Sequence, residues 1–256
     1  MTTAASSATG IPAIVSAGDL TDDDLAALYA YPAATTEPSV RANFVVSLDG
    51  AISTGGSSRG LTSPLDQRVL KLLRSLADVV LVGASTIRVE DYIGIRIPES
   101  GRERRKEQGL QPIPPLAVVS GRADIDPKSR LLTDTLVPPI ILTTTTAPAA
   151  AKRDLTAAGA QVVELGPDRV ETAAIIDTLT GLGMRRILCE GGPSLAGQLA
   201  ADDALDELCV TTAPVVVGGD ARRITHTDRP VQLTMSCEHI IFDTDGFQLA
   251  RWARKS

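Results

Sequence analysis

The chain has 256 residues, of which 43% are hydrophobic and 22% are charged, a composition typical of ordinary globular proteins. Its 25 Lys and Arg against 31 Asp and Glu give a net charge of −6, which argues against a general nucleic-acid binder. No apolar run approaches the roughly 18 residues of a membrane span, and the amino terminus lacks the basic segment of a signal peptide. We therefore expect a cytoplasmic protein that binds neither nucleic acid nor membranes.

The cysteines and histidines argue against two further classes of protein. Cys189, Cys209 and Cys237 are widely spaced and form no CxxC pair, which is typical of reduced thiols. The two histidines, His226 and His239, are too few for the common zinc motifs. We expect neither a disulfide framework nor a metal site.

Residues 1–40 differ in composition from the rest of the chain. They are rich in Ala, Ser and Thr, and they contain one predicted helix around Thr21–Tyr29 with acidic residues in its first turn. Pro32 and Pro38 then interrupt the helical pattern. We predict an N-terminal extension over residues 1–40, laid on the main domain or partly disordered, and a single domain over residues 41–256.

Beyond this extension, short apolar runs alternate with amphipathic stretches. The predicted strands are Ala42–Ser47, Val79–Gly83, Leu116–Ser120, Ile140–Thr143, Val162–Leu165 and Ile187–Glu190. The predicted helices are Pro64–Leu76, Thr86–Asp91, Pro148–Ala158, Val170–Leu182 and Pro193–Ala200. This alternation predicts an α/β fold with a central, mostly parallel sheet flanked by helices.

The C-terminal strands and one charge run complete the prediction of the fold. Four late strands follow with almost no helix between them and predict an antiparallel C-terminal edge of the same sheet. They are Leu208–Thr212, Val231–Cys237, Ile240–Asp243 and Phe247–Trp252. The charge run Arg102–Gln108 is interpreted as a solvated loop.

The strongest local signal is the segment Arg186–Gly197, in which a predicted strand ends at Glu190 and two glycines precede Pro193. Glycines let the backbone approach a ligand closely, and the free N–H groups of a first helical turn favour a phosphate. The alternative is a tight strand-to-helix turn in which the glycines only supply positive φ. Two interpretations of Glu190 stay open. It is a cap that faces the surface, or it is a carboxylate that binds substrate or takes part in acid–base chemistry, since apolar neighbours at a strand end can raise the pKa of a carboxylate.

A second strand-to-helix junction, Val82–Thr86, has the same form, with small residues after a buried strand and hydroxyls beside a helix N-terminus. Two such junctions in one parallel sheet both point to its carboxyl edge, where α/β proteins usually bind their ligands. A third segment, Ser47–Gly50, closes the first strand, and its Asp-Gly pair is interpreted as a simple turn.

Together these segments resemble one family. Six of them occur in the expected order, namely Asn43–Gly50, Ser58–Pro64, Leu73–Arg74, Val82–Thr86, Glu90–Asp91 and Glu190–Gly197. Over about residues 41–251 the chain resembles the reductase domain of bacterial riboflavin biosynthesis, which has the dihydrofolate-reductase fold. One such motif is weak evidence, whereas six in order are specific.

The resemblance implies an NADPH-dependent reduction of a pyrimidine phosphate of the 5-amino-6-ribosylamino-uracil type, whose ribosylamino side chain becomes ribitylamino. By position, Glu190 is the expected catalytic residue. The residues expected to face the substrate are Asn43, Ser58, Arg74, Arg96 and Glu190. The charge and fork geometry of the Arg74 guanidinium suit the substrate's phosphate.

The same resemblance places a second group of residues at NADPH. They are Thr62, Asp66, Gly83, Ala84, Thr86, Glu90, Ser120, Arg122, Gly191, Gly192, Pro193, Ser194 and Leu195. Among them, Ser120 and Arg122 are suited to the 2′-phosphate of the cofactor. A homodimer is also expected, because the resembling reductases are dimers and the strands over Leu208–Trp252 leave an edge to be covered.

Two departures from the family keep other functions open. The chain lacks the zinc-deaminase motif of the bifunctional enzymes, so we expect a stand-alone reductase. Asn43 stands where the family often has a lysine, and an amide cannot supply that charge. A dihydrofolate or pteridine reductase on the same fold is therefore one alternative, and a non-catalytic nucleotide-binding protein is another.

Overall fold

The computed structural model of the chain describes residues 12–32 and 36–255. Its strands are β1 (Ala13–Ser16), β2 (Ser39–Ser47), β3 (Val79–Gly83), β4 (Leu116–Val119), β5 (Ile140–Thr143), β6 (Gln161–Glu164), β7 (Arg186–Cys189), β8 (Glu207–Ala213), β9 (Met235–Phe242) and β10 (Gln248–Arg254). Its α-helices are α1 (Asp22–Leu28), α2 (Pro64–Leu76), α3 (Ala84–Glu90), α4 (Glu99–Glu107), α5 (Arg130–Thr133), α6 (Ala149–Ala157), α7 (Thr172–Gly181) and α8 (Pro193–Ala201). The remainder of the predicted N-terminal extension, at residues 1–11 and 33–35, lies outside the described residues.

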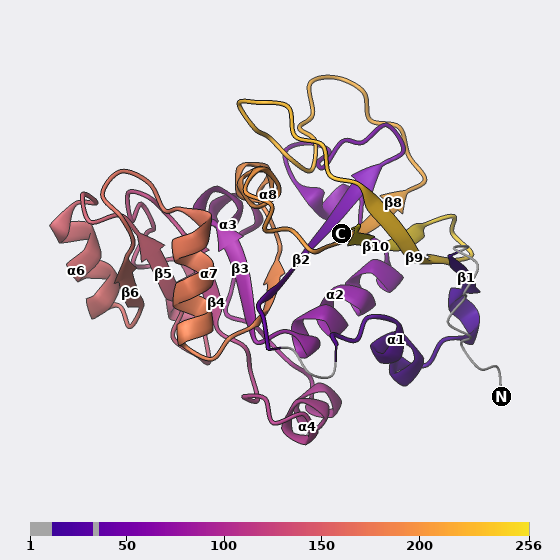
Figure 1. The fold of residues 1–256 in the computed structure, drawn as a ribbon, viewed down its shortest axis with the longest axis horizontal. Coiled ribbons are helices and arrows are strands. Elements are labelled where there is room, and N and C mark those ends of the chain that lie inside the picture. Colours follow the sequence, from indigo (N-terminus) through magenta and orange to yellow (C-terminus); the bar gives the residue numbers. More distant parts are fainter. Residues whose placement is uncertain (1–11, 33–35, 256) are drawn as a thin grey trace.

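The ten described strands form one sheet in the order β1-β9-β10-β8-β2-β7-β3-β4-β5-β6, which runs from right to left in Figure 1. Neighbouring strands from β8 to β6 are parallel, whereas β10 runs antiparallel to both β8 and β9. The predicted α/β fold, with a mostly parallel sheet and antiparallel C-terminal strands, is confirmed. The predicted edge differs in one respect, because β1 pairs with β9 and is the outermost strand.

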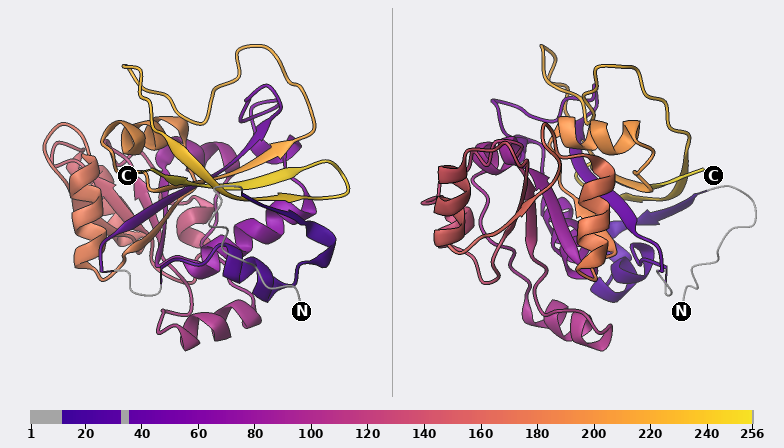
Figure 2. Two further views of the ribbon diagram at one scale, coloured as in Figure 1. Left: turned by 45° about the vertical axis from the view of Figure 1, so that its right-hand side comes forward. Right: turned by 60° about the vertical axis from the view of Figure 1, so that its left-hand side comes forward.

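Helices cover both faces of the sheet (Figure 2). Side chains of β3 alternate between two apolar clusters, as the two-residue period of a strand requires. Val80 and Val82 belong to the cluster that contains the buried leucines of α2, whereas Val79 and Leu81 belong to the cluster that contains those of α7 and α8. The sheet therefore has a core on each side, and its carboxyl edge lies between the two helical layers.

The sequence determines where α2 begins and which face it buries. Ser63 is the N-cap, since its hydroxyl accepts a hydrogen bond from the Asp66 N–H at 3.1 Å, and Pro64 occupies the first helical position. Four apolar side chains of the helix are buried against the sheet, namely Val69, Leu72, Leu73 and Leu76. The predicted bounds of this helix are confirmed.

Two predictions of secondary structure are wrong. The two strands predicted within 231–243 are one strand, β9, and the charge run Arg102–Gln108 belongs mostly to helix α4 rather than to a loop. Arg105 explains why the charge run is not a solvated loop. Its side chain is buried and donates hydrogen bonds to the carbonyl oxygens of Ser75 and Ala77 at 3.0 and 2.5 Å. The guanidinium therefore closes the C-terminal end of α2, a role that a count of charges does not reveal.

A buried ion cluster joins the N-terminal segment to the sheet. Arg41 of β2 and Arg251 of β10 each donate to the Glu207 carboxylate, at 2.5 Å in both cases. The same guanidinium groups also donate to the carbonyl oxygens of Tyr29 and Leu28 at the end of α1. Burial opposes the ionisation of Glu207, but these two arginines outweigh it and lower its pKa.

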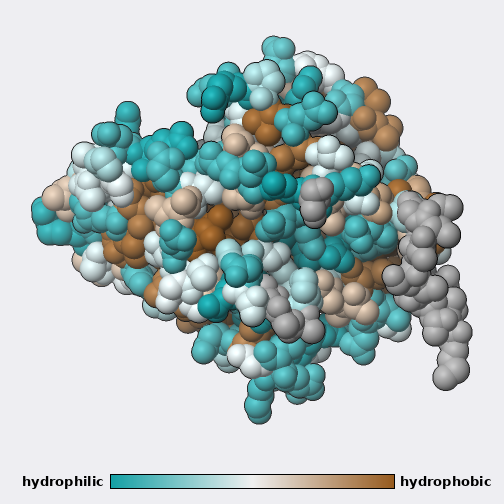
Figure 3. All heavy atoms as spheres, in the orientation of Figure 1, coloured by the Kyte–Doolittle hydropathy of each residue, from teal (hydrophilic) through white to brown (hydrophobic). Residues whose placement is uncertain are grey.

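Polar side chains cover most of the face drawn in Figure 3, and the apolar side chains lie in separate patches. Across residues 12–32 and 36–255, no helix combines the length and the apolar composition that crossing a bilayer requires.

Candidate active site

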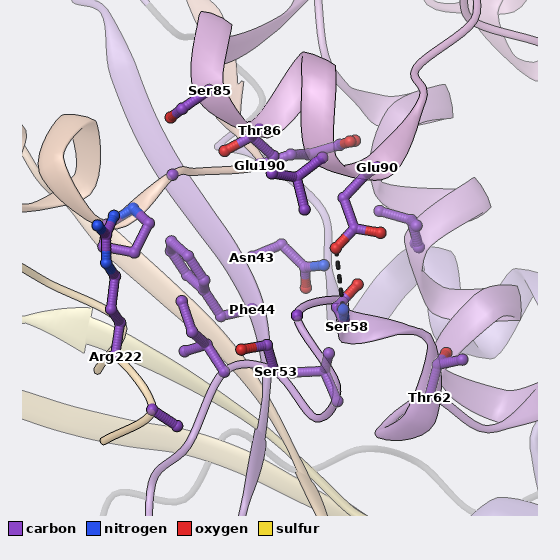
Figure 4. A pocket seen from close by; sticks show the side chains of 18 of the residues that line it. Asn43, Phe44, Ser53, Ser58, Thr62, Ser85, Thr86, Glu90, Glu190 and Arg222 are labelled. Atoms are coloured by element: carbon purple, nitrogen blue, oxygen red, sulfur yellow. Dashed lines mark hydrogen bonds between the residues drawn. The ribbon is translucent and has the colours of Figure 1, made fainter. Parts of the chain in front are cut away.

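A cavity of about 560 Å³ opens beside β2 and next to the ends of β3 and β7, and Figure 4 shows side chains that line it. Its wall comes from the middle of β2, the N-terminal turns of α2 and α8, helix α3, and two loops. The lining residues are Asn43, Phe44, Val45, Ile52, Ser53, Gly56, Ser58, Thr62, Asp66, Gln67, Leu70, Ser85, Thr86, Val89, Glu90, Tyr92, Glu190, Gly192, Pro193, Asp220, Ala221 and Arg222. This is the carboxyl edge at which the sequence predicts a ligand.

The two glycine junctions lie against each other at this edge. The Gly83 N–H donates to the Gly191 carbonyl oxygen at 2.8 Å. A Cβ at Gly192 would lie 2.6 Å from Thr86 Oγ1, so this position has no room for a larger residue without movement. Because α3 and α8 begin after Gly83 and Gly192, neither N-cap residue carries a side chain to occupy the first N–H groups of its helix.

A second cavity, of about 330 Å³, continues from the first and shares Ser85 and Gly192 with it. It is lined by Gly83, Ala84, Ser85, Arg88, Val119, Ser120, Gly121, Arg122, Asp124, Gly192, Ser194, Leu195 and Gln198. The residues predicted to bind the cofactor are thus divided between two adjoining cavities. Gly191 lines neither, but its carbonyl oxygen joins the two junctions.

The Glu190 carboxylate is buried in the wall of the first cavity and is held by two side chains. Its side chain is 3% exposed, and Arg74 binds both carboxylate oxygens at 2.7 Å in a bidentate pair. The Tyr92 hydroxyl donates to Oε2 at 2.8 Å. Since a carboxylate can accept about four hydrogen bonds, these three leave an acceptor position free on Oε1.

Arg74 and Tyr92 keep Glu190 in this geometry. Burial opposes the charge of Arg74, but the adjacent Glu190 carboxylate outweighs it and raises the pKa of the guanidinium. Burial and the same carboxylate raise the pKa of Tyr92 well above its ordinary value, so the phenol remains a hydrogen-bond donor. An arginine in a bidentate pair stays charged, and the pair fixes the plane of the carboxylate.

The structure does not bring every predicted substrate residue to the cavity. Asn43, Ser58 and Glu190 line it, whereas Arg74 lies behind Glu190 and is not among the lining residues. Arg96 is also absent from the lining residues and forms an ion pair with Asp134. Neither the phosphate role predicted for Arg74 nor the substrate contact predicted for Arg96 therefore finds support in their positions.

Glu90 and Asp66, two further carboxylates of the cavity, are occupied by neighbouring groups. Glu90 accepts from the Ser57 hydroxyl and from the Ser58 N–H, both at 2.9 Å, and the Ser58 contact is drawn in Figure 4. The Thr62 hydroxyl donates to the Asp66 carboxylate. These bonds hold the 57–66 segment beneath α3 and shape the wall that the sequence assigns to the cofactor.

Sequence reasoning missed Tyr92, Phe44 and the loop that carries Asp220 and Arg222. Tyr92 follows Glu90–Asp91 directly, so its position beside a predicted site residue was the one available signal. Phe44 is adjacent to Asn43 on β2 and lies beside it in Figure 4. The loop that contains Asp220 and Arg222 matches no motif considered above, and nothing in its local pattern points to the cavity.

This loop, residues 214–234, is tied to the Ser47–Gly50 turn. The Asp49 carboxylate accepts from the N–H groups of Val217 and Gly218, at 3.1 and 2.7 Å. Hydrogen bonds from Ser47, Gly218 and Val217 lower the pKa of Asp49 to about 2. The Asp-Gly pair is a turn, as predicted, and it also anchors a loop that lines the cavity.

Comparison with known proteins shows the family of this chain. The RibD C-terminal domain family matches residues 38–249 of this chain. The chain belongs to this family. It is 30% identical over 184 residues to the 2,5-diamino-6-ribosylamino-4(3H)-pyrimidinone 5′-phosphate reductase of Archaeoglobus fulgidus, which is 71% of this chain and 83% of that protein.

Two further comparisons give a consistent result. The riboflavin biosynthesis protein RibD of Bacillus amyloliquefaciens is 27% identical over 184 residues, which is 71% of this chain and 47% of that protein. A pyrimidine reductase-like protein of Corynebacterium diphtheriae superposes with a TM-score of 0.82 at 23% identity, over 93% of this chain and 100% of that chain. The fold is thus that of the RibD reductase domain, and the chain is a distant relative of riboflavin-pathway pyrimidine reductases.

Among the side chains that the structure describes, no group of three or more His, Cys, Asp or Glu lies in position to hold a metal ion.

Proposed function

We propose that the chain is an NADPH-dependent reductase of a phosphorylated riboflavin-pathway pyrimidine. The observation that carries this proposal is the buried Glu190 carboxylate, which is oriented by Arg74 and Tyr92 and lines a cavity that adjoins two glycine junctions. The name of the Archaeoglobus relative, a reductase of a diaminopyrimidine phosphate, supports the substrate class.

The residues present fit NADPH. The N–H groups of the first turn of α8 follow a glycine N-cap, and an N-terminal turn of this kind suits a phosphate. Arg122 and the Ser194 hydroxyl line the same second cavity and add a cation and a donor. When bound, NADPH supplies the hydride, and the shared lining at Ser85 and Gly192 would lead from the second cavity to the first.

The residues of the first cavity fit an aminopyrimidine. Glu190 is an acceptor, and the free position on Oε1 suits an amino or ring N–H of the substrate. Asn43, whose side chain lies between those of Phe44 and Glu90 in Figure 4, offers an amide that both donates and accepts. The contribution of these residues is to position the substrate against the cofactor rather than to form a bond with it.

Asn43 also favours a second candidate function. Because this amide replaces the lysine expected from the resemblance, a dihydrofolate or pteridine substrate on the same fold remains the alternative. The two candidates share Glu190, since both heterocycles present N–H donors to a carboxylate.

The deciding experiment is NADPH consumption by the purified chain with three substrates side by side: the diaminopyrimidine phosphate, its uracil counterpart, and dihydrofolate. We expect turnover of one of the pyrimidine phosphates, with kcat/KM well above that for dihydrofolate. The reverse ranking would assign the pteridine activity. Binding of NADPH without turnover of any of the three would instead support a non-catalytic nucleotide-binding protein.

The cofactor preference should depend on Arg122. We expect NADPH to bind more tightly than NADH, and the Arg122→Ala variant to weaken NADPH binding by about 10-fold, the loss of one charge-assisted contact. NADH binding should not change. Calorimetry with both cofactors measures this, with Lys128→Ala as the control, since Lys128 is exposed on the same segment and lines neither cavity. Equal affinity of the unaltered protein for NADPH and NADH would overturn the assignment.

We also propose a homodimer, on the basis of the resemblance. The sequence predicted an uncovered edge on the strands over Leu208–Trp252. In the structure none of these strands is an edge, since β8 and β10 lie inside the sheet and β1 covers β9. Sedimentation equilibrium at micromolar concentration is expected to give twice the mass of the chain. A single species of monomer mass would contradict the proposal.

A further inference from the structure

The charges that line the first cavity are unevenly distributed. Five lining residues are charged, namely Asp66, Glu90, Glu190, Asp220 and Arg222. Among the described residues of this wall, Arg222 is the only one with a cationic side chain. An anionic group bound in this cavity therefore has one cationic residue to bind.

The two arginines that the sequence assigned to the substrate are already paired. Arg74 is held by Glu190, and Arg96 is held by Asp134. Within residues 12–32 and 36–255, the Arg222 guanidinium has no carboxylate within ion-pair distance and no hydrogen-bond acceptor. Three of the four carboxylates of the cavity are hydrogen-bonded to other groups, and none of them forms an ion pair with Arg222.

The backbone of Arg222 is held in place although its side chain is exposed. The Ile52 N–H donates to the Arg222 carbonyl oxygen at 3.1 Å. On one side of it in the chain, Gly218 is bound to the Asp49 carboxylate, and on the other the His226 N–H donates to the Pro193 carbonyl oxygen at 3.0 Å. These bonds tie the loop both to the turn after β2 and to the start of α8.

Arg222 lies opposite the wall that holds Glu90 and Ser58, with Asn43 and Phe44 between them (Figure 4). We propose that Arg222 binds a phosphate group of the ligand in this cavity. A guanidinium with five donors and no protein partner matches the oxygens of a phosphate better than any other lining residue does. This proposal rests on the proposed function, which supplies a phosphorylated substrate and a phosphorylated cofactor.

The test compares three variants. Arg222→Ala removes the cation, Arg222→Lys keeps the charge without the fork, and Arg223→Ala is the matched control. Arg223 is the neighbouring exposed arginine and does not line the cavity, so its loss changes the net charge by the same amount. Two quantities are measured for each variant, the KM of the phosphorylated pyrimidine against its dephosphorylated form, and the dissociation constant of NADPH.

Arg222→Ala should raise one of these two constants by about 10- to 100-fold. Arg222→Lys should raise it less, because it keeps the charge but lacks the planar fork of the guanidinium. A rise confined to the KM of the phosphorylated pyrimidine assigns the substrate's phosphate. A rise in the NADPH dissociation constant assigns a phosphate of the cofactor. If Arg222→Ala behaves like Arg223→Ala in both measurements, the proposal is overturned.

A binding measurement separates this proposal from the proposed function. Calorimetry with ribose 5-phosphate and with ribose needs no turnover. We expect the unaltered protein to bind ribose 5-phosphate more tightly than ribose. If Arg222 binds the substrate's phosphate, Arg222→Ala loses this preference, and if Arg222 binds a phosphate of the cofactor, Arg222→Ala keeps the preference and binds NADPH more weakly. If both NADPH and ribose 5-phosphate bind to Arg222→Ala as they bind to the unaltered protein, Arg222 is not a phosphate ligand, whatever substrate the chain reduces.

Discussion

Replacing Arg74 by alanine is expected to lower the free energy of unfolding by roughly 3–5 kcal/mol, the range for breaking a buried ion pair. The variant leaves the Glu190 carboxylate, whose side chain is 3% exposed, with Tyr92 as its remaining partner. A buried carboxylate with one hydrogen-bond donor is far from satisfied. The loss should appear in denaturant unfolding of the chain without any ligand.

Arg68→Ala is the matched control for this prediction. Arg68 lies on the same helix and also forms an ion pair, with Asp22, but both side chains are more than a third exposed. An exposed pair is worth roughly 0–1 kcal/mol, so this variant should unfold close to the unaltered chain. The double variant Arg74→Ala with Glu190→Gln should recover part of the loss, because no unpaired charge then remains.

The sequence assigned Arg74 to the substrate's phosphate, and the same variants decide between the two roles. A substrate-binding Arg74 predicts a higher KM with unchanged stability, whereas a positioning Arg74 predicts lower stability together with a lower kcat/KM. Glu190→Gln keeps the shape of the side chain and should reduce kcat/KM while the NADPH affinity stays within a few-fold. If Arg74→Ala raises only KM, the positioning role is wrong.

Local pattern was sufficient for most of the fold. The Ser63 cap and Pro64 define the start of α2, and the apolar run Val79–Val82 has the length and residue types of a buried strand. The adjacency of the two glycine junctions also follows from sequence, because parallel strands end at one edge. These features depend on residues that are close together in the chain.

What could not be predicted depends on contacts between distant segments. Arg74 and Glu190 are 116 residues apart in the chain, and no local pattern distinguishes an arginine paired with a carboxylate from one that faces a substrate. Arg105 looks like one more residue of a charge run until the carbonyl ends of α2 are placed beside it. Arg222 lies in a loop without a motif, and only the fold brings that loop to the cavity.

The third glycine of the Glu190–Gly197 segment has a different role from the first two. Gly197 lies within α8, where a glycine ordinarily costs about 0.5–1 kcal/mol relative to alanine. A Cβ at this position would lie 2.3 Å from the His226 carbonyl oxygen and 2.8 Å from the carbon that carries it. The contact is with backbone, so no side-chain rotation can relieve it, and either α8 or the 214–234 loop must move.

We therefore expect Gly197→Ala to destabilise the chain by about 1–3 kcal/mol, the usual cost of overpacking, in spite of the better helix propensity of alanine. Moving the loop away from α8 also shifts Arg222, so the variant should weaken ligand binding in the same direction as Arg222→Ala. Gly181→Ala is the control, because Gly181 is an exposed glycine in α7 with open space around its Cβ position. That substitution should be neutral or stabilising, and if Gly197→Ala behaves in the same way, α8 does not hold the loop in place.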